Sequence, residues 1–273
     1  MNEVIAYIVS RLSDVYPEQE CRDMAWWIAE ETTGMSRTQL LCGCKDTKII
    51  PNLEIILSRL RNKEPIQYIF GHTLWNGLDL FVDASTLIPR PETAELVDYL
   101  CRRTAHLANT PLRVLDIGTG TGCIAIALKK ARPRWTVQGL DVSPHALSVA
   151  RRNAVGNHVE VDFLQADILS DPIADYDLIV SNPPYICNRE RTLMDENVLR
   201  YEPATALFVP DTDPLLFYRR IATLHKAPLL FFEINEAYGN ETMEMLRQEG
   251  YTQTTLINDI YGKPRIVSGE YTE

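Results

Sequence analysis

The apolar residues of the first 63 positions recur at helical spacing. They form three stripes, namely Val4, Ile5, Ile8, Val9 and Leu12, then Cys21, Met24, Ala25 and Ile28, and then Leu53, Ile56, Leu57 and Leu60. Apolar residues three and four positions apart lie on one face of an α-helix, and that face must be covered. The pattern therefore predicts a small helical bundle over residues 1–63, a domain without visible catalytic groups.

The pattern changes between residues 64 and 92. Alternating apolar positions flank Asn76 and Gly77, a dipeptide that favours the two-residue turn of a β-hairpin. We expect a hairpin over 64–92 that links the helical bundle to a second domain over 93–273. The linker ends in a rigid, proline-containing segment that leads into a helix at about 93–107.

From residue 113 onward, apolar runs of strand length alternate with helical stretches. Strands are expected at 113–117, 135–141, 159–165, 176–181, 228–234, 252–258 and 264–269, and helices at 122–131, 144–155, 214–226 and 238–249. Such alternation is typical of a parallel sheet with crossover helices. The predicted fold class is α/β, with a mostly parallel seven-stranded sheet.

Composition excludes several classes of protein. The chain has 273 residues, of which 45% are hydrophobic and 23% charged, as in ordinary globular proteins. Without an 18-residue apolar run or a secretory signal, we expect a cytoplasmic protein that does not contact membranes. The net charge of −10 disfavours a nucleic-acid partner. The six cysteines and five histidines show no metal-ligand spacing, so we expect reduced thiols and no metal. A monomer is the default expectation.

A glycine-rich turn follows the strand at 113–117 and leads into the next helix. Its residues are Gly118, Thr119, Gly120, Thr121 and Gly122. Such a turn lets a ligand approach the backbone at a helix N-terminus, although it can also be a tight turn and nothing more. The spacing is not the G-x-G-x-x-G of dinucleotide-binding proteins, and no Gly-Lys-Ser/Thr follows. A dinucleotide and a nucleoside triphosphate are therefore disfavoured.

Two acidic residues follow the next two strands. Asp141 ends the second strand, where a carboxylate can accept hydrogen bonds from ribose hydroxyls. Asp167 and Ile168 follow the third strand, where the carboxylate could meet an adenine amine while the isoleucine packs on the ring. Each acid could instead be an ordinary exposed loop residue.

The fourth strand ends in Asn182, Pro183, Pro184 and Tyr185. Two prolines cannot continue a strand, so the backbone leaves the sheet in a stiff, extended form at the carboxyl edge, where ligands of open α/β sheets bind. Asparagine and backbone carbonyl oxygens accept hydrogen bonds, and tyrosine offers a flat face. The combination suits a planar NH₂ group and indicates chemistry on an amide or amino nitrogen.

These features, in this order, resemble those of the class I methyltransferases that use S-adenosylmethionine. Over nearly its full length the chain is similar to the protein-(glutamine-N5) methyltransferases of the HemK/PrmC family, which modify peptide chain release factors. The segments that carry the resemblance are 64–71, 87–93, 114–122, 179–186, 201–203 and 206–207. The segment 88–93 and the helical N-terminal domain make the match specific, because the Asn-Pro-Pro-Tyr motif alone occurs in several amino-group methyltransferases.

The resemblance implies a class I (Rossmann-like) fold, S-adenosylmethionine as cofactor and S-adenosylhomocysteine as product. It also implies methyl transfer to the glutamine of the Gly-Gly-Gln loop of release factors. The turn 118–122 would line the methionine end of the cofactor, Asp141 would hold the ribose, and Ile168 would flank the adenine. Asn182 and Tyr185 would be catalytic, and 182–185 would grip the glutamine. The N-terminal domain would recognise the substrate.

Two positions depart from the family pattern. Ile168 replaces a residue that is often aromatic, which should weaken stacking on adenine. Asn235 stands where many relatives have glycine, in a strand-end segment expected to lie far from the Asn-Pro-Pro-Tyr motif. Neither departure removes a reacting group.

Other interpretations remain open at this point. The motif at 182–185 would grip the amine of an adenine in DNA or RNA equally well, although base flipping needs a basic track that this acidic chain lacks. The chain could also be a non-catalytic scaffold that binds the cofactor. The long, charged segment 187–213 is expected to be a lid or a binding surface.

Overall fold

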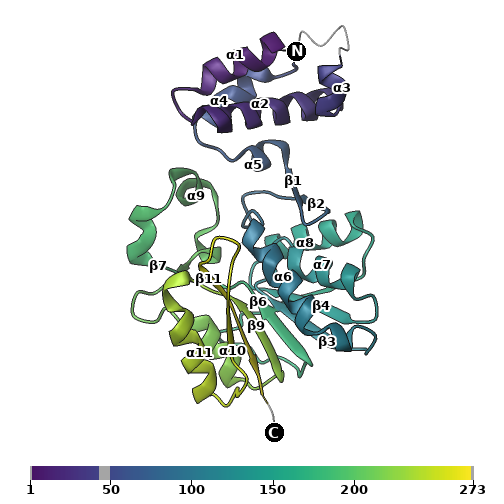
Figure 1. Cartoon of the computed structure of the whole chain (residues 1–273), viewed down its shortest axis with the longest axis vertical. Helices are drawn as coiled ribbons and strands as arrows, with labels where there is room; N and C mark the ends of the chain where they lie inside the picture. Colours follow the sequence, from purple (N-terminus) through teal and green to yellow (C-terminus); the bar gives the residue numbers. More distant parts are fainter. Residues whose placement is uncertain (1, 43–49, 272–273) are drawn as a thin grey trace. The chain divides into compact units, whose positions relative to one another are not determined.

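The structure is a computed structural model that describes residues 2–42 and 50–271. The chain forms two compact units, Met1–Gly71 and His72–Glu273 (Figure 1). The helical domain expected over 1–63 is thus extended by one short helix. Cys44, one of the cysteines considered above, lies outside the described residues, whereas Cys21, Cys42, Cys101, Cys123 and Cys187 are free thiols.

The first unit is a bundle of helices around one core. The helices are α1 (Asn2–Leu12), α2 (Glu18–Thr33), α3 (Arg37–Leu41), α4 (Leu53–Arg61) and α5 (Ile66–Phe70). The three predicted stripes supply the buried side chains of α1, α2 and α4. The short helices α3 and α5 were not expected, because five residues are too few to show a helical period. Gly71 ends α5 with φ of +76°, a conformation that glycine adopts without strain.

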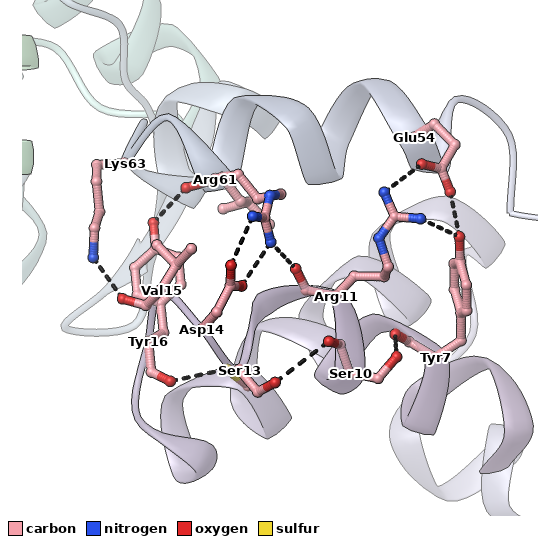
Figure 2. A network of polar contacts seen from close by, with 12 residues as sticks. Tyr7, Ser10, Arg11, Ser13, Asp14, Val15, Tyr16, Glu54, Arg61 and Lys63 are labelled. Atoms are coloured by element: carbon pink, nitrogen blue, oxygen red, sulfur yellow. Dashed lines mark hydrogen bonds and ion pairs between the residues drawn. The ribbon is translucent and has the colours of Figure 1, made fainter.

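Polar side chains connect α1 and α4 on the surface of this unit (Figure 2). Tyr7 donates a hydrogen bond to Glu54 over 2.7 Å, and the Arg11 guanidinium lies 3.2 Å from the same carboxylate. Arg61 pairs with Asp14 through two nitrogens at 2.6 and 2.7 Å. These side chains are largely exposed, so the pairs orient the two helices while the apolar stripes supply most of the stability.

The hairpin expected over 64–92 is shorter than predicted and consists of β1 (His72–Trp75) and β2 (Leu78–Phe81), which pair antiparallel. Asn76 and Gly77 have φ of 46° and 73°, the two positive values that a type I′ turn requires. The hairpin packs within the second unit, because the amide of Asn153 exchanges two hydrogen bonds with the backbone of Phe81.

The second unit is built on one seven-stranded sheet (Figure 1). Its spatial order is β10-β11-β9-β6-β3-β4-β5. The strands are β3 (Arg113–Ile117), β4 (Thr136–Asp141), β5 (Asp162–Gln165), β6 (Leu178–Ser181), β9 (Leu229–Glu233), β10 (Thr255–Asn258) and β11 (Pro264–Glu270). Only β11 runs antiparallel to its neighbours. The predicted α/β class with a mostly parallel seven-stranded sheet is confirmed.

Helices cover both faces of this sheet. They are α6 (Pro91–Arg103), α7 (Cys123–Ala131), α8 (Pro144–Gly156), α10 (Leu216–Thr223) and α11 (Gly239–Gln248). Val114 packs into a core with α6, α7 and α8, while the next residue, Leu115, packs into a second core with α10 and α11. Because successive strand residues point to opposite faces, strands buried on both sides read as continuous apolar runs.

The segment after the Asn-Pro-Pro-Tyr motif has more structure than the sequence indicated. It contains β7 (Ile186–Cys187), α9 (Glu196–Tyr201) and β8 (Phe208–Val209), and β7 pairs with β8 in parallel. Two-residue strands carry no periodicity, so only the length and charge of this segment were visible in the sequence. In the described part of the chain, no helix has the length and apolarity to cross a membrane.

Candidate active site

The glycine-rich turn lies at the carboxyl edge of the sheet, between β3 and α7. Gly118, Gly120 and Gly122 have φ of +71°, +53° and +80°, conformations that strain other residues. The backbone amides of Gly118 and Thr119 both donate to the carbonyl of Leu140, over 2.8 and 3.0 Å. These bonds fix the turn against the neighbouring strand β4 and leave one side of it open.

A buried carboxyl group supports the turn from inside the sheet. Asp116 is fully buried, and one of its oxygens accepts hydrogen bonds from the Thr119 hydroxyl at 2.6 Å and the Ala125 amide at 3.2 Å. Its other oxygen has no partner within the protein. Burial raises the pKa of Asp116 to about 7, against the lowering effect of the two hydrogen bonds. The unpartnered oxygen is therefore a buried acceptor close to the turn.

Asp141 lies at the end of β4, as predicted. Its two carboxylate oxygens accept hydrogen bonds from the amides of Gly120 and Ser143, both at 2.9 Å. Burial raises the pKa of Asp141, and these backbone bonds act in the opposite direction. Each carboxylate oxygen has a second acceptor position, so Asp141 can hold the turn in place and still accept a hydrogen bond from a ligand.

A cavity of about 430 Å³ opens on this turn. The predicted residues that line it are Gly118, Thr119, Gly120, Thr121, Asp141, Asp167, Ile168, Asn182, Pro183 and Pro184. Gly122 is not among them. A Cβ atom there would lie 3.2–3.3 Å from Ala150, Ile126 and Phe163, so this glycine serves the packing of α7 against α8 and β5. The cavity size falls in the range that small-molecule ligands use.

The Asn-Pro-Pro-Tyr corner follows β6 and adjoins the glycine turn. Ser181 donates to the carbonyl of Ile117 over 2.7 Å, and a Cβ atom on Gly118 would lie 3.9 Å from the carbonyl oxygen of Asn182. Parallel neighbouring strands bring their carboxyl ends to the same edge, which explains why the turn after β3 and the corner after β6 meet.

A second cavity, of about 250 Å³, also borders Asn182. Its lining comprises Leu87, Arg90, Asn182, Tyr185, Ile186, Leu193, Met194, Asp195, Val198, Ala206 and Leu207. Four of these residues, Leu87, Arg90, Asn182 and Ala206, also line the first cavity. Asn182 thus borders both spaces, while Tyr185 lines only the second. The segment 187–213 supplies walls for both cavities.

An ion pair ties this segment to the loop before α6. Arg90 contacts Glu202 over 2.6 Å, and the second oxygen of Glu202 accepts from the amide of Ile88 at 3.3 Å. The Glu202 side chain is only 1% exposed, so its charge depends on these partners. Both residues belong to segments that carried the family resemblance, but no sequence pattern indicated that they contact each other.

The prediction that Asn235 lies far from the Asn-Pro-Pro-Tyr motif is wrong. The Asn235 amide donates to the carbonyl of Tyr185 and to the carboxylate of Glu190, at 3.2 Å each. The distance along the chain was misleading because β9 is the parallel neighbour of β6, so the ends of both strands lie at one edge.

Sequence reasoning also missed two residues next to Asn182. Thr93, near the start of α6, and Glu233, at the end of β9, are 2% and 1% exposed, and the threonine hydroxyl donates to the carboxylate over 2.7 Å. Burial raises the pKa of Glu233 to about 7, against the lowering effects of Thr93, Arg265 and Tyr185. A buried acid at the end of an apolar strand was the available signal.

Comparison with known proteins identifies the chain as a methyltransferase. Residues 102–200 match the model of the methyltransferase small domain, and residues 3–71 match that of the PrmC N-terminal domain. Among solved structures, the hMettl16 catalytic domain in complex with an RNA hairpin superimposes with a TM-score of 0.58 at 15% identity, covering 82% of this chain and 94% of that one. The fold and these matches define a class I methyltransferase that depends on S-adenosylmethionine.

Relatives narrow the class to one family. The chain is 43% identical to the release factor glutamine methyltransferase of Bacteroides thetaiotaomicron, over 98% of this chain and 99% of the relative. It is 42% identical to that of Flavobacterium psychrophilum, over 95% of both chains. The chain therefore belongs to the release factor glutamine methyltransferase family, as the sequence motifs predicted.

Within the described ranges, no group of three or more His, Cys, Asp or Glu side chains is arranged to hold a metal ion. Asp141 and Asp167 line the first cavity. Carboxylates accept hydrogen bonds, so these side chains fit the ribose hydroxyls and amino groups of S-adenosylmethionine.

Proposed function

We propose that this enzyme transfers a methyl group from S-adenosylmethionine to the side-chain nitrogen N5 of the glutamine in the Gly-Gly-Gln loop of peptide chain release factors. One observation carries the proposal: Asn182 borders both the cavity at the glycine turn and the second cavity. Groups in the two cavities would therefore meet at this side chain. The names of the relatives support the choice of acceptor.

The first cavity is the proposed cofactor site. Asp141 accepts from the ribose hydroxyls, Asp167 faces the adenine amine, and Ile168 packs against the adenine ring. The turn from Gly118 to Gly122 surrounds the methionine end, with Gly122 acting through packing. When bound, S-adenosylmethionine supplies an electrophilic methyl group on its sulfonium sulfur, and S-adenosylhomocysteine remains after transfer.

The second cavity is the proposed site of the acceptor glutamine. Its amide nitrogen is a weak nucleophile, because the lone pair is shared with the carbonyl group. The side-chain oxygen of Asn182 and the carbonyl of Pro183 accept its two hydrogens, which orients the nitrogen and stabilises the positive charge that develops there. The stiffness of Pro183 and Pro184 holds these oxygens in place. Such alignment can lower a barrier by about 7–11 kcal/mol in favourable cases.

Tyr185 gives the glutamine amide a flat surface in this cavity. Its hydroxyl donates to Glu233 over 3.2 Å, and this bond fixes the ring. Burial raises the pKa of the Tyr185 hydroxyl, as does the nearby charge of Glu233, so the phenol stays protonated. We assign it a positioning role by its ring and no part in proton removal. Loss of the acceptor proton follows methyl transfer without a dedicated base.

The helical unit is the proposed contact for the body of the release factor, and 187–213 contacts the loop. The proposal also includes the other expectations from the sequence. These are a cytoplasmic location, no nucleic-acid or membrane partner, and a monomeric protein.

A labelling experiment tests the proposal. Purified enzyme is incubated with radiolabelled S-adenosylmethionine and either a full-length release factor or its variant with Gln→Ala in the Gly-Gly-Gln loop. We expect stoichiometric labelling of the wild-type factor and background labelling of the variant. Equal labelling of both proteins, or labelling of DNA or RNA in their place, would overturn the assignment.

A further inference from the structure

A chain of hydrogen bonds connects Asn182, on the wall of both cavities, with Thr93, which lines the first cavity, and with the buried Glu233. The Asn182 amide nitrogen donates to the Thr93 hydroxyl over 3.1 Å, and that hydroxyl donates to one oxygen of Glu233 over 2.7 Å. The Tyr185 hydroxyl donates to the other oxygen of Glu233 over 3.2 Å. These four residues come from α6, the corner after β6, and the end of β9.

The number of available protons fixes the direction of every bond in this chain. An ionised carboxylate only accepts hydrogen bonds, and a threonine hydroxyl has one proton. Because Thr93 gives that proton to Glu233, it can only accept from Asn182. The amide of Asn182 must therefore turn its NH₂ group toward Thr93, and its oxygen lies on the opposite side of the group. The network therefore determines which end of the Asn182 amide is the NH₂ group and which is the oxygen.

We propose that Thr93 and Glu233 are positioning residues that set the orientation of the Asn182 amide, so that its oxygen meets the acceptor nitrogen. This inference rests on the proposed function, because it assumes an acceptor with an NH₂ group beside Asn182. A reversed amide would place one NH₂ group against another, so that a donor would face a donor. Neither Thr93 nor Glu233 needs to contact the substrate to exert this control.

Two charged residues and two neutral donors surround Glu233, and burial raises its pKa to about 7, so the carboxylate ionises as the pH rises past this value. Arg265, on β11, is the nearby positive charge, and it is also bonded to Asp259 at 3.2 Å. Glu92, on α6, is the opposing negative charge. The carboxylate oxygens themselves are bonded to Thr93 and Tyr185. Both are neutral donors, so the direction of the bonds depends on the ionisation of Glu233.

A pair of substitutions at one position tests the proposal. Thr93→Val keeps the size of the side chain but removes the hydroxyl, and Thr93→Ser keeps the hydroxyl. We expect T93V to lower kcat by about 10- to 100-fold, with the cofactor Kd changed by no more than about twofold. T93S should restore kcat to within about threefold of the wild type. A T93V enzyme with wild-type kcat would overturn the proposal.

A matched control separates positioning from general damage to the helix. Thr104, at the other end of α6, is also buried, and its hydroxyl bonds only to the carbonyl of Leu100 over 2.8 Å. Thr104→Val removes a comparable bond far from the corner and should lower the Tm while kcat stays unchanged. If T104V and T93V lower kcat equally, the effect is structural and the proposal fails.

A double-mutant cycle shows whether Thr93 acts through Asn182. In the Asn182→Ala background, T93V should cause no further loss of kcat, because the group that it positions is gone. If N182A lowers kcat and T93V costs the same factor in both backgrounds, the positioning role fails while the proposed function survives. If N182A has no effect on kcat, both the catalytic role of Asn182 and the positioning role are wrong.

A second measurement covers the case in which T93V does not fold. Wild-type kcat should rise between about pH 6 and pH 8 as Glu233 ionises, and Glu233→Gln, which has no titrating group, should abolish this rise. A rise of equal size in E233Q would contradict the proposal.

Discussion

The glycine turn and the Asn182 corner lie side by side at one edge of the sheet, yet they are built differently. The turn is made of backbone: its shape follows from three glycines with positive φ and from amides that bond to Leu140 and Asp141. The corner depends on side chains from distant segments, since Thr93 and Glu233 are 140 positions apart in the chain. We infer a division of labour, in which the turn determines cofactor affinity and the corner determines turnover.

Substitution of Tyr185 should have a large effect, of about 100-fold, and should fall on turnover. Tyr185→Ala removes the ring that is proposed to face the acceptor, and a loosely held amide should lower kcat by about 100-fold. Tyr185→Phe keeps the ring and loses only the bond to Glu233, so kcat should fall by about threefold. Steady-state kinetics at saturating cofactor measures both variants. An equal loss in the two would mean that the hydroxyl, and not the ring, carries the role of Tyr185.

Substitution of Asp141 should have the next largest effect and should fall on affinity. In Asp141→Asn, one oxygen becomes an NH₂ group that cannot accept from the amide of Gly120 or Ser143. The turn loosens and a ribose acceptor is lost, so we expect the cofactor Kd to rise by about tenfold. Isothermal titration calorimetry with S-adenosylhomocysteine measures this change. An unchanged Kd would show that Asp141 serves only the fold.

A smaller effect concerns pH, which should act in opposite directions on stability and turnover. Burial raises the pKa values of Asp116 and Glu233 to about 7, above their ordinary values of 3.8 and 4.5. Since the folded state then holds protons that the unfolded state has lost, the free energy of unfolding should fall as pH rises from about 4 to about 7.

Turnover should instead rise by several-fold through pH 7, because only an ionised Glu233 compels Thr93 to accept from Asn182. Urea unfolding and kcat measured over the same buffers check both trends. A Glu233→Gln enzyme should lose part of the dependence of stability on pH, and the remainder reports on Asp116. A wild-type protein in which stability and turnover rise together would contradict this account.

The glycine turn and the Asn182 corner also differ in how well the sequence predicts them. The strand β3, the turn at Asn76 and Gly77, and the glycines of 118–122 are specified by neighbouring residues, and each lies where the sequence placed it. Local conformation and short-range periodicity suffice for such features. The residues of the proposed cofactor site were visible for this reason.

The polar network behind Asn182 could not be predicted in the same way. Thr93 was visible as part of a family segment and Glu233 as an acid after an apolar run, but only the sheet order brings them together. The same holds for the ion pair between Arg90 and Glu202 and for the contact of Asn235 with Tyr185. Contacts of high sequence separation depend on topology, which leaves no local pattern.

The most direct test of the central claim compares Asp141→Asn and Asn182→Ala in one pair of assays. Cofactor Kd is measured by calorimetry, and kcat is measured at saturating cofactor with a full-length release factor. The division of labour predicts that D141N loses affinity and keeps its kcat, while N182A keeps its affinity and loses kcat by more than about 100-fold. If either substitution lowered cofactor affinity and kcat by similar factors, the glycine turn and the Asn182 corner would form one functional unit and the claim would be wrong.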